Sequence, residues 1–288
     1  MAQPRTTYRY CKPDATTRLR SLRDRAWVVQ KRQPDPVPPA ASAGLAPILL
    51  PSPSVVVALP TPIFEGSQER LFPDGVVLVT SRDIEDGLDL FPEELQAMAR
   101  ATSARRFEFA LGRRCAREAL AILGGPLVAI PVGRFRDPVW PFGYVGSITH
   151  CRGFCAAAAA RTQRGSNSRS IRGLGLDSAP ATSLPEELAG VVCSADECAW
   201  MARERGDGVP WDRLFFCAKE SAYKCLFPAT HRFLDLRDMG VRFDPERGSF
   251  DVTLPSLFGS PSRLTGQYSV RGDILLAATT WIEGSACP

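Results

Sequence analysis

The order of predicted elements along the chain indicates an α+β fold built from two halves of similar plan. A strand, then helices, then strands are expected within residues 61–172, and the same order recurs within residues 173–284. Short apolar or alternating runs bounded by Gly and Pro are typical of antiparallel strands. Longer runs with apolar residues three and four positions apart are typical of helices. The likeness lies in the order of the elements, not in the residues.

The first half should contain one strand, a long helical stretch and a pair of strands. VVLVT at 76–80 is the strand, and residues 91–125 form one long helix or two consecutive ones that end at Gly124-Gly125. VGSITH at 145–150 and the run 154–160 follow as strands. The alanines of the second run favour helix by propensity, but the run is short and bracketed by turns, so we expect a strand.

The second half should begin with a strand, GLGLD, that ends at Asp177. Residues 184–203 predict two short helices, and Ser194 with Glu197 three residues later indicates a capping box for the second. A longer helix follows and should stop at Pro228. The runs VRFD, SFDVTL, LTGQYSV and DILLAATTWI then predict an antiparallel meander.

Residues 1–60 are expected to be a disordered or loosely attached leader, because their proline density opposes regular helix and central strand. The run 55–59 could add an edge strand. A chain of 288 residues has room for one large domain or two small ones.

Composition narrows the function classes. The formal charge of +4 among 288 residues is only mildly basic, so it does not demand a nucleic-acid partner. Nine cysteines, without a Cys-x-x-Cys pair, are typical of reduced thiols in a cytoplasmic protein. No apolar run approaches the roughly 20 residues of a membrane helix. Only two histidines occur, which excludes a site with three His ligands.

The stretch FFCAKESAYKCLF at 215–227 is the first candidate site. It holds two of the four lysines of the chain, Lys219 and Lys224, with Glu220 and Tyr223 between them. On a helix these polar residues adjoin an apolar stripe. The alternative is a solvated helix face with a Glu220–Lys224 ion pair.

Three further stretches carry groups suited to phosphate and metal. The segment 104–120 places five arginines on one predicted helix, and guanidinium groups bind phosphate through paired hydrogen bonds. VGSITH ends in His150 after small residues, and GLGLD ends in Asp177. Each also has a structural alternative: a solvated basic face, a core histidine, and a turn residue. Together they favour magnesium-assisted phosphoryl-group chemistry, with Glu220 as the second carboxylate. No Walker, Rossmann or kinase motif is present.

The segments GRRCAREAL, DPVWPFGYVGSITHC, GLGLD and WDRLFFCAKESAYKCLFP, in this order, resemble the 4′-phosphopantetheinyl transferases of the Sfp type. The likeness is greatest to the branch with the enterobactin component D enzymes and the actinobacterial activators of polyketide and peptide synthetases. It covers residues 64–282. It implies two pseudo-symmetric α+β halves with coenzyme A in the cleft between them.

The resemblance also implies an activity: transfer of 4′-phosphopantetheine from coenzyme A to a serine of an apo acyl or peptidyl carrier protein, with magnesium, or alternatively manganese, and release of 3′,5′-ADP. Asp177 and Glu220 would hold the metal, and Glu220 or a metal-bound water that it orients would take the serine proton. Lys219 and Lys224 would contact the diphosphate. The contacts to the nucleotide and its phosphates would come from Arg105, Arg113, Arg136, Ser147, Thr149 and His150. Tyr223 and Phe233 would line the pantetheine arm or the carrier-docking surface.

One residue departs from the family pattern. The usual strand ending is Gly-x-Asp-x-Glu, whereas this chain has Ala179 in the last position. Because magnesium normally keeps several waters, water can fill the place of the lost ligand. The alternatives are therefore a working transferase with weaker metal binding and a catalytically weak or inactive homologue that binds coenzyme A or carrier proteins. A nucleic-acid-binding module ranks last, because few aromatic residues lie among the arginines. We expect a cytoplasmic monomer with no membrane or nucleic-acid partner.

Overall fold

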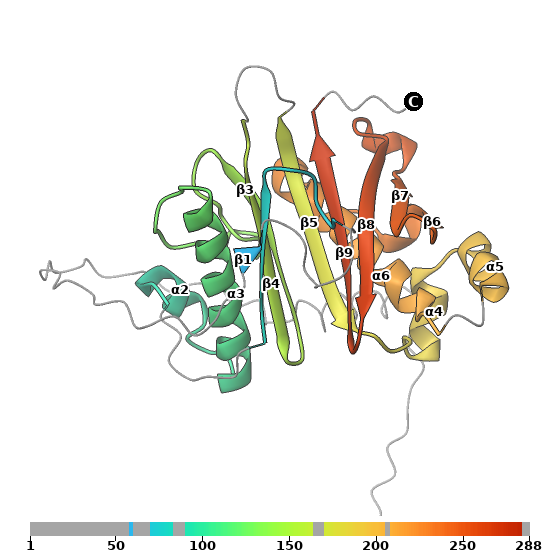
Figure 1. Cartoon of the computed structure of the whole chain (residues 1–288), viewed down its shortest axis with the longest axis horizontal. Helices are drawn as coiled ribbons and strands as arrows, with labels where there is room; N and C mark the ends of the chain where they lie inside the picture. The colour runs from blue at the N-terminus through green and yellow to red at the C-terminus, as the bar shows by residue number, and fades with distance from the viewer. Residues whose placement is uncertain (1–57, 60–69, 83–89, 164–169, 205–207, 284–288) are drawn as a thin grey trace, which may run out of the picture. The chain divides into compact units, whose positions relative to one another are not determined.

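A computed structural model describes residues 58–59, 70–82, 90–163, 170–204 and 208–283. Most of the predicted leader and the tip of the polar loop after residue 163 therefore lie outside the described residues. Two antiparallel sheets and the helices that cover them make up the described chain (Figure 1), which confirms the α+β class.

The first sheet has the strand order β1-β2-β4-β3. Its strands are β1 (Ala58–Leu59), β2 (Val76–Ser81), β3 (Tyr144–Cys151) and β4 (Phe154–Arg161). The last two residues of the run 55–59 thus do form an edge strand, paired with β2. The alanine run is a strand, as predicted, and it lies between β2 and β3.

Two helices belong to this sheet, α2 (Pro92–Ala97) and α3 (Ser103–Ile122), so the helical stretch at 91–125 is two consecutive helices. Apolar residues of α3 pack on one face of the sheet, against the odd-numbered alanines of β4. The even-numbered alanines on the opposite face pack against β5 and β9 of the second sheet. Because alanine is small, β4 is buried on both faces between two closely packed layers.

The second sheet has the order β5-β9-β8-β7-β6. Its strands are β5 (Ile171–Pro180), β6 (Gly240–Asp244), β7 (Ser249–Thr253), β8 (Arg263–Arg271) and β9 (Ile274–Ile282), and the last four form the predicted meander. The prediction that the first strand ends at Asp177 was wrong. Pairing with β9 continues to Pro180, opposite Ile274, so Asp177 lies within β5.

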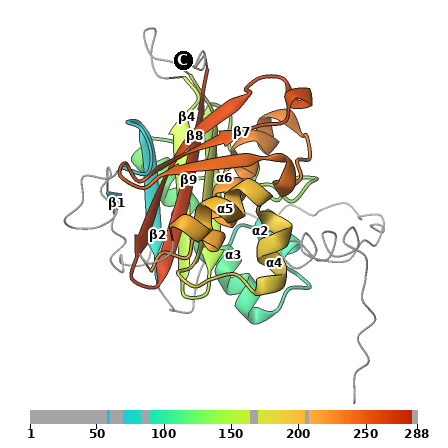
Figure 2. The same cartoon turned by 90° about the vertical axis from the view of Figure 1, so that its right-hand side faces the viewer.

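Three helices cover the far face of this sheet: α4 (Glu186–Val192), α5 (Ala195–Arg203) and α6 (Trp211–Thr230), with short 3-10 turns at Leu236–Asp238 and Ser256–Phe258 (Figure 2). The capping box of Ser194 and Glu197 is present. The prediction that α6 stops at Pro228 was wrong: Pro228 lies in its last turn. The helix ends at Thr230, and the C-cap residue His231 adopts a left-handed conformation.

The two sheets meet along β3 and β5, which are joined by side-chain hydroxyls. The Leu176 amide donates to Ser147 Oγ at 3.0 Å, and the Ser178 amide donates to Thr149 Oγ1 at 2.9 Å. The hydroxyls of Ser147 and Thr149, two residues apart on β3, thus accept the β5 amides as backbone carbonyls would in a regular sheet. These bonds hold the middle of β5 against β3.

Candidate functional site

Two glycines of β5 bring helix α6 onto the strand backbone. A Cβ atom on Gly175 would lie 1.7 Å from the Ser221 carbonyl oxygen, and one on Gly173 would lie 2.2 Å from the Cys225 carbonyl oxygen. Only glycine permits this approach. Helix α6 therefore lies directly over β5, and its polar residues come beside Asp177.

Asp177 and Lys224 form the centre of the candidate site. Lys224 Nζ lies 2.6 Å from Asp177 Oδ1 and also donates to the Leu176 carbonyl at 3.2 Å. The Thr149 hydroxyl lies 3.3 Å from the same carboxylate oxygen. The Asp177 side chain is 11% exposed and that of Lys224 is 22% exposed, so the pair is shielded but can still be reached from solvent.

Glu220 adds a second carboxylate to this pair. Burial lowers the pKa of Lys224, but the charges of Asp177 and then Glu220 outweigh that effect and leave its pKa raised. The ammonium is therefore influenced by both carboxylates and stays charged. Cys217, one turn earlier on α6, is buried beside Asp177; burial, with that carboxylate, holds the pKa of its thiol well above the usual value. The sequence argument did not include Cys217.

His150 and Arg105 adjoin this group. Arg105 Nη1 donates to His150 Nε2, and His150 Nδ1 lies 3.4 Å from Glu108 Oε2. Burial and then the Arg105 cation lower the pKa of His150 to about 4, while Lys224 and Asp177 also act on it. The imidazole is therefore neutral at neutral pH, with its hydrogen on Nδ1 toward Glu108. Glu108, which also pairs with Arg105 at 3.3 Å, was missed from the sequence.

Arg136 completes a set of cations on this side. It has a left-handed backbone with φ of 69°. Burial and then repulsion by Arg105 lower its pKa, so the two guanidinium groups lie near one another. Two like charges held close together favour an anion between them. Arg105 and Lys224 thus act on the neutral His150, and Arg136 adds a third cation beside Arg105.

Three other predicted contacts are in the interior. Arg113 is 5% exposed, and its Nε donates to the Ile130 carbonyl at 2.6 Å; burial lowers its pKa to about 10. Ser147 and Thr149 are also buried, and their hydroxyls accept the β5 amides described above. The structure brings Thr149 to Asp177, but it turns Arg113 toward Ile130 and not toward His150.

Lys219 is also separate from the other predicted residues. Its side chain is 0% exposed, and its ammonium donates to Glu197 Oε2 at 2.7 Å and to the Val192 carbonyl at 2.8 Å. Lys219 and Lys224 thus bind different partners on different sides of α6.

Tyr223 and Phe233 belong to an aromatic cluster next to the polar group. The Phe227 ring lies 5.3 Å from Tyr223 and 5.1 Å from Phe233, and Phe135 lies 5.8 Å from Phe233. Phe233 is 59% exposed and Phe135 37% exposed, so the cluster offers an apolar surface. The sequence argument missed Phe135, although it lies beside Arg136 in the same loop.

The donor groups fit magnesium in one particular way. Among the described residues no group of three or more His, Cys, Asp or Glu side chains could hold a metal by itself. Ala179 packs into the apolar core of the second half and offers no donor. Magnesium is commonly bound by one or two carboxylates together with waters and substrate phosphates. Asp177 and Glu220 match that mode, in which the metal would arrive with a phosphate-bearing substrate.

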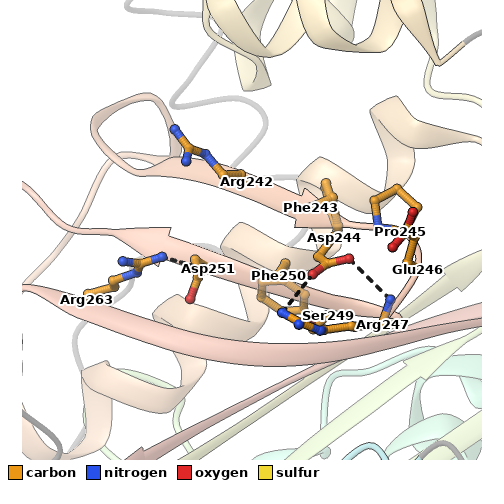
Figure 3. A pocket seen from close by; sticks show the side chains of 10 residues that line it. All are labelled: Arg242, Phe243, Asp244, Pro245, Glu246, Arg247, Ser249, Phe250, Asp251 and Arg263. Carbon is orange, nitrogen blue, oxygen red and sulfur yellow. Dashed lines mark hydrogen bonds and ion pairs between the residues drawn. The ribbon is translucent and has the colours of Figure 1, made fainter. Parts of the chain in front are cut away.

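A surface hollow of about 480 Å³ lies elsewhere, over β6, β7 and β8 (Figure 3). Asp251 pairs there with Arg263, and Asp244 with Arg247 at 3.4 Å. None of the predicted site residues lines it, and its charges are largely matched within it. Within the part of the chain that the structure describes, no helix has the length and hydropathy needed to cross a bilayer.

Comparison with known families gives two matches. The N-terminal domain model of the 4′-phosphopantetheinyl transferases matches residues 93–160, and the model of the 4′-phosphopantetheinyl transferase superfamily matches residues 173–272. The two matches contain Arg105, His150, Asp177, Glu220 and Lys224.

Three curated relatives are similar to this chain. The 4′-phosphopantetheinyl transferase Npt of Nocardia iowensis is 37% identical over 209 residues, 73% of this chain and 90% of its own. PptT of Mycobacterium tuberculosis is 36% identical over 67% of this chain and 86% of its own. Svp of Streptomyces mobaraensis is 42% identical over 57% of this chain and 65% of its own. Both are also 4′-phosphopantetheinyl transferases.

Proposed function

The chain belongs to the 4′-phosphopantetheinyl transferase superfamily and is a transferase, and on that premise we propose the reaction that its site performs. The 4′-phosphopantetheine group of coenzyme A is moved to a serine hydroxyl of an apo carrier protein, with magnesium, and 3′,5′-ADP is released. The observation that carries this proposal is the Asp177–Lys224 pair at 2.6 Å, with Glu220 acting on the same ammonium.

Each end of coenzyme A has suitable partners. Its phosphates need cations, and Arg105, Arg136 and Lys224 supply them. The neutral His150 accepts from Arg105 and so holds that guanidinium in place. Its pantetheine arm needs an apolar wall, which Tyr223 and Phe233 supply. Ser147 and Thr149 support the site by holding β5, and so Asp177, in place.

Magnesium held by Asp177 and Glu220 would neutralise charge on the diphosphate. The serine Oγ attacks the β-phosphorus while Glu220 accepts its proton, directly or through a water. The bond from the β-phosphorus to the bridging oxygen breaks, and 3′,5′-ADP leaves with the electron pair. Lys224 can stabilise the negative charge that develops on the leaving group, because its ammonium is already held in place beside Asp177.

The natural protein substrates would be carrier proteins or carrier domains of polyketide, nonribosomal peptide or fatty-acid synthases. The first two kinds of synthase make secondary metabolites. We propose that the enzyme acts in the cytoplasm as a monomer. The packing of Ala179 in the apolar core supports one alternative, a homologue that binds coenzyme A or a carrier but transfers slowly.

The test is the intact mass of an apo carrier incubated with the protein, coenzyme A and magnesium. A working transferase adds one phosphopantetheine group, and chelation with EDTA stops the addition. Glu220→Gln should slow it by about a hundredfold or more, as expected for a removed base. Glu187→Gln, on an exposed helix face, should leave it unchanged. No mass change with fatty-acid, polyketide or peptide carriers, although coenzyme A binds, would establish the alternative.

A further inference from the structure

Glu197 is a buried carboxylate that joins three elements. It is 5% exposed, at the third position of α5, and its Oε2 accepts the Ser194 amide at 2.8 Å in the capping box. Its Oε1 accepts the Val241 amide of β6 at 2.8 Å, and Lys219 of α6 donates to Oε2 at 2.7 Å. The cap uses only the bond to the Ser194 amide, so a carboxylate that also binds Val241 and Lys219 serves more than the end of α5.

Lys219 is enclosed by the partners of that carboxylate. Two acceptors, Glu197 and the Val192 carbonyl at the end of α4, receive its ammonium, and none of its side chain is exposed. Figure 2 shows α4 and α5 beside α6, where these partners lie. A phosphate group could reach the ammonium only if both helices moved aside. The geometry is therefore that of a structural anchor, not of a substrate contact.

The anchor acts on the residues of the site through the rotation of α6. Lys219 and Glu220 are consecutive and so point about 100° apart on the helix. Fixing the first toward α4, α5 and β6 fixes the second, and with it Lys224 one turn later, toward Asp177. A rotation of the helix would change the distance of both groups from Asp177.

The first half contains a matching arrangement that serves as a control. Glu94, 0% exposed at the third position of α2, accepts the Phe91 amide in its own capping box and the Ile130 amide at 2.9 Å. Arg117 of α3 donates to both of its oxygens at 2.9 Å. This ion pair fixes α3, which carries Arg105, a phosphate contact in the proposed function. It does not act on Glu220.

We propose that Glu197 and Lys219 are a positioning pair for the transfer reaction, in which the buried ion pair sets the orientation of Glu220 and Lys224 without touching the substrate. The expected change in kcat rests on the proposed function, because it requires that the protein catalyses the transfer. Its geometric claim, that the ammonium of Lys219 stays out of reach of coenzyme A, can be measured without any turnover.

The first experiment is reductive methylation of the lysines in the folded protein, followed by peptide mass spectrometry. Lys219 should react at least about tenfold more slowly than in the urea-unfolded chain, as expected for an enclosed group. Added coenzyme A and magnesium should not change its rate, whereas Lys224 should become protected. Reaction of Lys219 at the rate of Lys224, with protection by coenzyme A, would overturn the proposal even if no variant folds.

The second experiment compares Lys219→Met, Glu197→Gln and the double variant, because a neutral pair can replace a buried ion pair at small net cost. Lys219→Met should lower kcat by about tenfold or more, with KM for coenzyme A little changed. The double variant should regain kcat to within about threefold of the wild type. Arg117→Met, the control, should raise KM for coenzyme A more than it lowers kcat.

A double variant that melts like the wild type but stays as slow as Lys219→Met would refute the positioning role, because only a direct contact needs the ammonium itself. If the wild type modifies no carrier, the proposed function fails, but the methylation result still decides where Lys219 lies. The two failures can therefore be told apart.

Discussion

Replacement of Gly175 by alanine should separate α6 from β5. The added Cβ would lie 1.7 Å from the Ser221 carbonyl oxygen, 2.7 Å from its carbonyl carbon and 2.9 Å from the Cys225 amide nitrogen. All three are backbone atoms, so no side chain can rotate away to relieve the contact. The helix would have to move by about 1.3 Å before the shortest contact reached even 3.0 Å, below which real Cβ atoms essentially never come.

Overpacking of this kind costs about 3 kcal/mol, at the upper end of the usual range. For a chain of this size that cost lowers the melting temperature by roughly 6–12 °C. Because Lys224 and Glu220 move with the helix away from Asp177, kcat/KM should fall by about a hundredfold in the fraction that is folded. Urea unfolding and the carrier assay at 15 °C measure the two effects separately.

The matched control is Gly190→Ala on α4, where an added Cβ meets no atom within 4 Å. Alanine is the better helix former, so this variant should be as stable as the wild type or more stable by up to about 1 kcal/mol. Wild-type stability and activity in Gly175→Ala would refute the argument that direct contact of β5 and α6 builds the site.

Two further predictions concern the seam between the sheets and the histidine. Thr149→Val keeps the shape of the side chain but removes the acceptor of the Ser178 amide, which should cost about 1–3 kcal/mol in urea unfolding; Thr253→Val, at an exposed position of β7, should cost much less. The pKa of His150 is lowered by burial, then by Arg105, to about 4 from 6.5, so the unfolded chain binds the extra proton between these values. Stability should therefore fall as pH drops from about 6.5 toward 4, and His150→Gln should reduce that slope; an unchanged slope would show that the imidazole is not held neutral.

Much of the architecture followed from periodicity and from the Gly and Pro positions. The α+β class, the alanine strand and the final meander were predicted, and residues 91–125 form two helices, one of the two arrangements that the sequence left open. The ends of elements were less certain, because pairing partners outside the local sequence decide them. β5 continues past Asp177 because β9 extends alongside it, and α6 continues past Pro228, so the proline did not end the helix.

The grouping of site residues was predicted only in part. Asp177, Lys224, Glu220, His150 and Arg105 do lie together, as their charges and spacing indicated. Lys219 was expected with them, yet it is 140° from Lys224 on the helix. The residues four positions before it and three after it, Phe215 and Ala222, are both apolar, which was the signal available in the sequence, and both are buried. That Glu197 would reach it from another helix required the tertiary structure.

The alanine strand has a consequence for how the gene can change. Ala156 to Ala160 are each 0% exposed, with α3 on one side and the second sheet on the other. A side chain larger by even one methylene would push one layer away from the other, at a cost of about 1–3 kcal/mol. The most repetitive stretch of the described chain should thus be among its least substitutable. Its low sequence complexity therefore goes with a tight limit on side-chain volume and not with a tolerance of substitution.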